Sequence, residues 1–303
     1  MALSDHVNTF GRYLRERYPE RVHKLCVSVG FTCPNMDGSR GRGGCTFCNN
    51  ASFTPQGFDG GEVASQIAAG REVVRRRTGA RHYIAYFQAY TNTYADVERL
   101  RRLYDEALAQ PGVIGLSIGT RPDCVPDEVL DLLLAYRDQG HEVWLELGLQ
   151  SASDATLRRV NRGHGLSEYV DAVTRARKRR LPVCTHLIAG LPGESPEQVR
   201  KTVECVVDHG VDGLKLHPLH VVRGTQLAQE WRRGAYTPWS METYVATAAE
   251  MVRAVPAEIV WHRLTATARQ PLLLAPQWCS AKWRVLNAIE TALAQQAAGH
   301  GGG

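Results

Sequence analysis

The sequence lacks an apolar run long enough to cross a membrane. The longest apolar stretches, residues 181–191 and 271–276, are much shorter than the roughly 20 residues that a membrane-spanning helix needs. The N-terminal residues also lack the apolar segment of a signal peptide. We therefore expect a protein that stays in the cytoplasm and has no membrane partner.

Repeats and strong compositional bias are also missing up to the glycine-rich end at 299–303. An apolar content of 44% and a charged content of 22% exclude a wholly disordered or collagen-like chain. The 303 residues suit one large domain with a sizeable core. The net charge of +5 permits an anionic partner such as RNA without requiring one.

Short apolar runs alternate with helical patterns along most of the chain. The runs at 23–29, 82–88, 113–119, 142–149, 182–189 and 213–218 predict six parallel strands joined by right-handed helical crossovers. We divide the chain into an N-terminal helix (1–22), this α/β core (23–222), a C-terminal extension (223–295) with a strand at 258–262, and a flexible tail (296–303). Either a doubly wound sheet or a partial barrel fits the core.

The carboxyl ends of the predicted strands carry the chemically active residues. Cys33 follows the first strand, Gln88 ends the second, and Gln150 follows the fourth. Both architectures build their active sites at this edge of the sheet. Lys215, His217 and His220 surround the end of the sixth strand, where they either act on a substrate or fill structural roles.

Three cysteines in a glycine-rich loop form the sharpest motif. Cys45 and Cys48 have CxxC spacing, and Cys33 precedes Cys45 by an eleven-residue gap. In a cytoplasmic protein such cysteines favour metal binding over disulfides. A structural zinc ion needs a fourth ligand from elsewhere in the chain, whereas an iron–sulfur cubane held by three thiolates leaves one iron open for chemistry.

Several motifs together resemble the radical S-adenosylmethionine (SAM) superfamily. The lengthened cysteine gap is similar to that of the elongator catalytic-subunit branch. Within it, the sequence resembles the YhcC-like proteins in CPNxDGxxGRGGCTFC at 33–48, FQAYTNT at 87–93 and LHPLH at 216–220. Further agreement comes from TRPD at 120–123, ELGLQS at 146–151 and HLIAGLPGE at 186–194.

This resemblance implies an α/β fold with a partial (β/α)6, TIM-like barrel. It also implies a 4Fe–4S cluster on Cys33, Cys45 and Cys48, with SAM bound to the open iron. In the superfamily, reduction of SAM yields a 5′-deoxyadenosyl radical that abstracts hydrogen from the substrate.

The resemblance implies contacts to SAM at five further positions. Gln150 and Arg162 match SAM-contacting residues of related enzymes, and Phe47 is placed to lie against the adenine. Gln88 begins the stretch that replaces the usual Gly-Gly-Glu after the second strand. Glu146 shares one strand face with Gln150; an alternative role for it is a structural ion pair.

The elongator-like motifs suggest that the radical chemistry modifies a wobble uridine of tRNA. An external electron donor such as flavodoxin or ferredoxin is then required. Two alternatives remain open: a non-catalytic iron–sulfur or zinc module that mediates redox-sensitive interactions, and a radical SAM enzyme that acts on a small metabolite or a protein.

Overall fold

Seven parallel strands form the central sheet of the computed structural model, which describes residues 3–49 and 61–299. Their order is β1-β2-β3-β4-β5-β6-β8. Most are buried along their whole length, which explains their nearly continuous apolar sequences. The strands are β1 (Val22–Val27), β2 (His82–Phe87), β3 (Val113–Thr120), β4 (Glu142–Gln150), β5 (Val183–Ala189), β6 (Gly213–Pro218) and β8 (Val260–Arg263).

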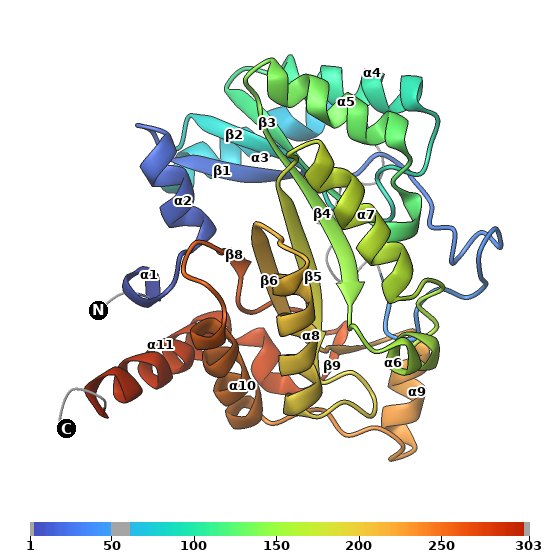
Figure 1. Ribbon diagram of the computed structural model, residues 1–303, viewed down its shortest axis with the longest axis vertical. Helices are drawn as coiled ribbons and strands as arrows, with labels where there is room; N and C mark the ends of the chain where they lie inside the picture. The colour runs from blue at the N-terminus through green and yellow to red at the C-terminus, as the bar shows by residue number, and fades with distance from the viewer. Residues whose placement is uncertain (1–2, 50–60, 300–303) are drawn as a thin grey trace.

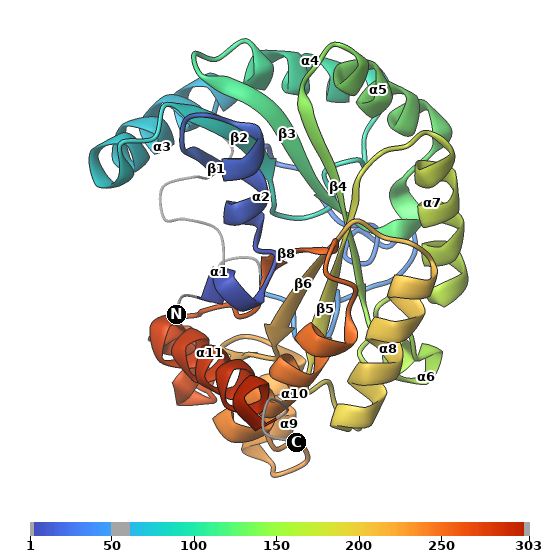
Figure 2. The ribbon, with the colours of Figure 1, turned by 60° about the vertical axis from the view of Figure 1, so that its left-hand side comes forward.

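Helices between successive strands cover the outer face of this sheet, which curls into a half-barrel (Figure 2). Ser195 illustrates how they begin: its hydroxyl accepts a hydrogen bond from the Gln198 N–H, and Pro196 occupies the first helical turn. Serine and proline both favour these positions. The outer helices are α3 (Val63–Thr78), α4 (Val97–Leu108), α5 (Asp127–Asp138), α7 (Leu166–Lys178) and α8 (Pro196–Asp208). The short helices η2 (Pro122–Cys124) and α6 (Asp154–Arg159) lie in loops.

The N-terminal segment closes the bottom of the half-barrel, at the amino ends of the strands. It forms two helices, α1 (Leu3–His6) and α2 (Phe10–Arg17), because the Trp261 N–H donates to the Asn8 carbonyl and interrupts a single long helix. Phe10 and Leu14 pack with Trp144 and other inward-facing side chains in one apolar cluster. This cluster separates the barrel interior from solvent below.

The C-terminal region adds helices, the edge strand β8 and a small second sheet. The helices are α9 (Gln226–Arg232) and α10 (Met241–Ala254), and the predicted strand at 258–262 joins the main sheet as β8. The sequence pattern missed the pairing of β7 (Val221–Val222) with β9 (Leu273–Ala275), together with η3 (Gln277–Ser280) and α11 (Lys282–Gly299). Figure 1 shows α11 beside α10, near the N-terminal helix α1.

The structure confirms the predicted α/β fold of partial-barrel type, with a seventh strand added to the expected six. The predicted tail begins within α11, and residues 300–303 lie outside the described part of the chain. Among the helices of the described residues, none is long and apolar enough to cross a membrane.

Candidate active site at the carboxyl ends of the strands

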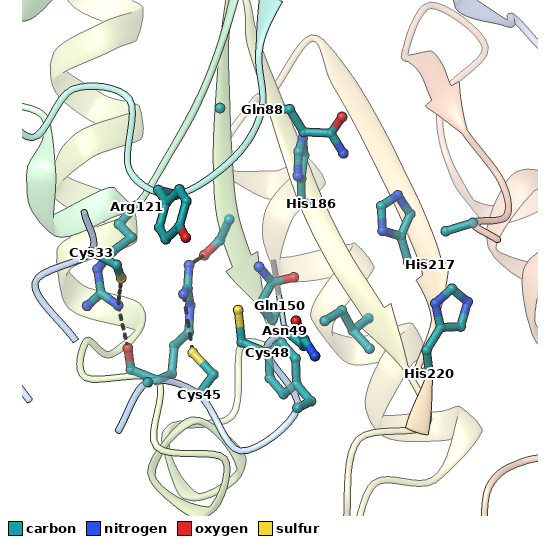
Figure 3. A pocket seen from close by; sticks show the side chains of 18 of the residues that line it. Cys33, Cys45, Cys48, Asn49, Gln88, Arg121, Gln150, His186, His217 and His220 are labelled. Atoms are coloured by element: carbon teal, nitrogen blue, oxygen red, sulfur yellow. Dashed lines mark hydrogen bonds between the residues drawn. The ribbon is translucent and has the colours of Figure 1, made fainter. Parts of the chain in front are cut away.

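The loop after β1 brings all three predicted metal ligands to one cavity. Cys33, Cys45 and Cys48 line a space of about 260 Å³ at the carboxyl ends of the strands (Figure 3). The loop folds back on itself through hydrogen bonds such as Cys48 N–H to Cys45 C=O, 2.9 Å. Asn161 anchors it from the far side, since its side-chain amide donates to the Gly44 carbonyl at 2.7 Å.

The three thiols do not form a ready-made site for a single ion among the described residues. Within residues 3–49 and 61–299, no three Cys, His, Asp or Glu side chains are grouped closely enough to hold one metal ion. The thiol of Cys48 lies near those of Cys45 and Cys33, and thiolates at these positions would repel one another. A polynuclear iron–sulfur cluster binds each thiolate through a different iron and removes this repulsion. The three cysteines therefore fit a 4Fe–4S cluster.

Two guanidinium groups approach the cysteine sulfurs. Arg162 Nη1 lies 3.5 Å from Cys45 Sγ, and Arg121 Nη1 lies 4.0 Å from Cys33 Sγ. Arg121 is held in place by a buried bidentate ion pair, with both N–O distances to Asp123 at 2.9 Å. These two cations would balance part of the negative charge of a cluster bound through thiolates.

Four of the five predicted SAM contacts line the same cavity: Phe47, Gln88, Gln150 and Arg162. Gln150 has a φ of +79°, a left-handed conformation that is uncommon for a residue with a side chain and tends to mark functional sites. Gly148 leaves room for the Arg162 and Gln150 side chains, because an added Cβ would lie 2.9 Å from Arg162 Nη2 and from Gln150 Nε2.

The Arg162 guanidinium already has two protein partners. Besides its contact with Cys45, its Nη2 donates to the Gly148 carbonyl at 2.6 Å, while its buried Nε has no partner among the described residues. Its recognition of a SAM carboxylate stays a prediction. The geometry also gives Arg162 a second role, which is to hold Cys45 against the end of β4.

Glu146 lies inside the barrel but does not line the cavity. Its carboxylate accepts hydrogen bonds from Lys24, Lys215 and His186, the last at 2.6 Å. Although burial opposes ionisation, the two lysines hold the pKa of Glu146 well below its usual range. A contact between Glu146 and SAM remains untested, and the observed contacts favour the alternative of a structural ion pair.

The histidines that the sequence singled out lie on a different side of the cavity from the cysteines. Figure 3 shows His186, His217 and His220 on this side, and all three line the cavity. Lys215 lies below them and donates to the Tyr86 hydroxyl at 2.9 Å. Sequence reasoning missed Tyr86 and Arg263, which also line the cavity; their places at the ends of strands were the available signal.

The sequence matches two domain families of one superfamily. Residues 37–206 match the radical SAM superfamily, and residues 211–295 match the radical SAM C-terminal domain. Protein YhcC of Escherichia coli strain K12 is 52% identical over 283 residues, which cover 93% of this chain and 91% of that protein. The chain therefore belongs to the radical SAM superfamily and, within it, to the YhcC family.

More distant likenesses point to elongator-type proteins. The structure resembles that of archaeal Elp3 from Methanocaldococcus infernus with a TM-score of 0.66 at 19% identity, covering 91% of this chain and 63% of that one. The tRNA uridine(34) acetyltransferase of Dehalococcoides mccartyi is 38% identical over 151 residues, which cover 49% of this chain and 32% of that protein. The structural likeness supports the fold, since fold alone does not fix function.

Membership in this superfamily identifies the chain as a radical SAM enzyme. Enzymes of the superfamily generally use a 4Fe–4S cluster and SAM and need an electron donor.

Proposed function

We propose that Cys33, Cys45 and Cys48 hold a 4Fe–4S cluster and that SAM binds beside it in the cavity. One observation carries the proposal: the three cysteines and four polar or aromatic candidates for SAM contact line the same cavity at the carboxyl ends of parallel strands. When bound, the two cofactors would supply a 5′-deoxyadenosyl radical that abstracts hydrogen from a substrate.

The protein's own residues would position the cofactors and exclude water. Arg162 and Arg121, beside Cys45 and Cys33, would balance part of the negative charge of the bound cluster. Gln88 and Gln150 offer amide groups at the ends of β2 and β4, where hydrogen bonds to a nucleoside are geometrically available. The half-barrel shields the reactive space from solvent. A flavodoxin or ferredoxin would deliver the electron.

The test is reconstitution of the protein with iron and sulfide under anaerobic conditions, followed by reduction and addition of SAM. We expect cluster absorbance and release of 5′-deoxyadenosine, both abolished in Cys33→Ala, Cys45→Ala and Cys48→Ala. Cys205→Ala serves as the matched control, because Cys205 lies on α8 and does not line the cavity. A fully loaded, reduced protein that leaves SAM intact would indicate a non-catalytic iron–sulfur module instead, and a protein that retains only zinc would indicate a zinc module.

We further propose that the substrate is tRNA, modified at a wobble uridine. The partial similarity to a tRNA uridine(34) acetyltransferase and the net charge of +5 support this choice. Binding of tRNA should weaken steeply with salt, because released counterions drive it, and nucleoside mass spectrometry should show a new or altered uridine. Salt-insensitive or absent tRNA binding, with continued SAM cleavage, would favour a small metabolite or a protein as substrate.

A further inference from the structure

One wall of the cavity, away from the cysteine loop, is built by β5, β6 and β8. His186 comes from β5, His217 from β6, His220 from the turn after β6, and Arg263 from the end of β8. We call His217, His220 and Arg263 the histidine–arginine wall. Figure 3 shows its two histidines on the opposite side of the view from Cys33 and Cys45.

Arg263 is the unusual member of this wall. Its side chain lines the cavity and is half-buried, yet its guanidinium makes no hydrogen bond or ion pair with any residue in the described part of the chain. The other two arginines of the cavity, Arg121 and Arg162, have protein partners. A half-buried cation without a counter-charge costs free energy unless a ligand supplies one.

The surroundings of Arg263 do not supply that counter-charge. Among the described residues that line the cavity there is no aspartate or glutamate. Beneath the wall, Glu146 is shared between Lys24 and Lys215, so this one carboxylate already faces two cations. The interior therefore keeps an excess of positive charge next to Arg263.

The histidines of the wall are neutral rather than additional cations. Burial, with Arg263 nearby, holds the pKa of His217 well below its usual value, and burial lowers the pKa of His220 to about 4. The Nε2 atoms of both rings are buried without a hydrogen-bond partner in the described residues. Buried polar atoms of this kind normally have hydrogen-bond partners. A bound molecule would supply the missing partners.

We propose that the histidine–arginine wall is a subsite for an anionic group of the substrate, a carboxylate or a phosphate. Arg263 would bind two of its oxygens, since a guanidinium matches both groups bidentately, and an Nε2–H of His217 would donate a further hydrogen bond. This inference rests on the proposed function, in which SAM occupies the cysteine side of the cavity and leaves the wall to the substrate.

The experiment titrates the folded protein without SAM, using inorganic phosphate in one arm and acetate in the other. Ionic strength is held constant with chloride, and binding is followed by calorimetry and by the shift in unfolding temperature. We expect saturable binding that weakens roughly tenfold or more in Arg263→Gln, which loses a charge-assisted interaction. Stronger binding in the phosphate arm would identify a phosphate as the group, and stronger binding in the acetate arm a carboxylate.

Two controls separate this subsite from general charge effects. Arg269→Gln removes the same charge from an exposed position that does not line the cavity and should leave anion binding unchanged. Arg263→Lys keeps a positive charge without the bidentate geometry and should bind with intermediate affinity. In chloride alone, Arg263→Gln should unfold at no lower temperature than the wild type, because Arg263 has no protein partner to lose.

Absence of saturable anion binding to the wild type would overturn the proposal, and so would equal weakening in Arg263→Gln and Arg269→Gln. These results are independent of the SAM-cleavage assay, which is measured on the same preparation. Failure of cleavage with intact anion binding would reject the proposed function, whereas cleavage without anion binding would reject only the subsite.

Discussion

Glu146 offers the sharpest test of how the barrel interior is held together. Its carboxylate is fully buried and is approached by Lys24 of β1, His186 of β5, Lys215 of β6 and His262 of β8. It therefore ties both edge strands of the half-barrel to the centre of the sheet. Changing it to glutamine keeps the size of the side chain but leaves the buried Lys215 and the half-buried Lys24 without a counter-charge.

The expected loss in the free energy of unfolding follows from these buried ion pairs. Removing one partner of a buried ion pair typically costs about 3–5 kcal/mol, because the remaining charge stays buried. With a shift of about 2–4 °C per kcal/mol for a large domain, Glu146→Gln should lower the unfolding temperature by roughly 6–20 °C. Denaturant and thermal unfolding of the apo protein would measure the loss.

The matched control is Glu197→Gln. Glu197 is exposed on α8 and pairs with Arg200 and Lys201, and exposed pairs contribute only about 0–1 kcal/mol. If Glu146→Gln costs no more than this surface variant, the buried carboxylate does not hold the strands together and the reasoning is wrong.

The stability difference between wild type and Glu146→Gln should also depend on pH. Burial lowers the pKa of Lys215 to about 8 against the opposing effect of Glu146, so loss of Glu146 lowers that pKa further. Between the two values the native wild type holds one proton more than the native variant, while the unfolded chains bind equal numbers at Lys215. Over that range stability rises less with pH in the wild type, so the stability difference should narrow as the pH rises toward about 8 and stay constant above it. A difference that widens over this range would contradict the assignment.

Two further substitutions test the bottom of the barrel and the part of the cavity near Arg162 and Gln150. Phe10→Ala should lower the free energy of unfolding in denaturant by roughly 3–5 kcal/mol. The Phe10 ring stacks on His262 with ring centroids 4.1 Å apart and meets Trp144 edge-on with centroids 5.7 Å apart. Trp283→Ala, at a position 71% exposed, is the control and should change stability by less than about 0.5 kcal/mol. Gly148→Ala should weaken SAM binding in equilibrium dialysis of the reconstituted protein by about tenfold, since the added methyl group presses on Arg162 and Gln150; unchanged affinity would show that SAM does not use this part of the cavity.

The sequence predicted the strands well because their formation depends on local pattern. β2, for example, is an unbroken apolar and aromatic run from Tyr83 to Phe87, and burial on both faces requires such runs. The break between α1 and α2 could not be predicted in this way. It depends on a hydrogen bond from Trp261 to Asn8, whose partners are far apart in the chain.

In the candidate site, too, local sequence patterns predicted some features, whereas contacts between distant strands could not be predicted. The cysteine spacing is a local signal, and it predicted three side chains that the fold does bring to one cavity. The contacts of Glu146 are not local, because its partners come from β1, β5, β6 and β8. Strand alternation placed the residue inside the barrel, but only the register of the sheet could show that two lysines meet it there.

The inward-facing side chains therefore form three layers along the barrel axis, each with its own physical role. Phe10, Leu14 and Trp144 close the bottom with apolar contacts, and the ion-pair layer around Glu146 lies above them. His186 belongs to this second layer through Glu146 and to the cavity above through its ring. Because a buried carboxylate and two lysines fix its orientation, a substrate would meet a preorganised imidazole rather than a mobile one. Stability of the interior and order in the cavity thus depend on the same ion pairs.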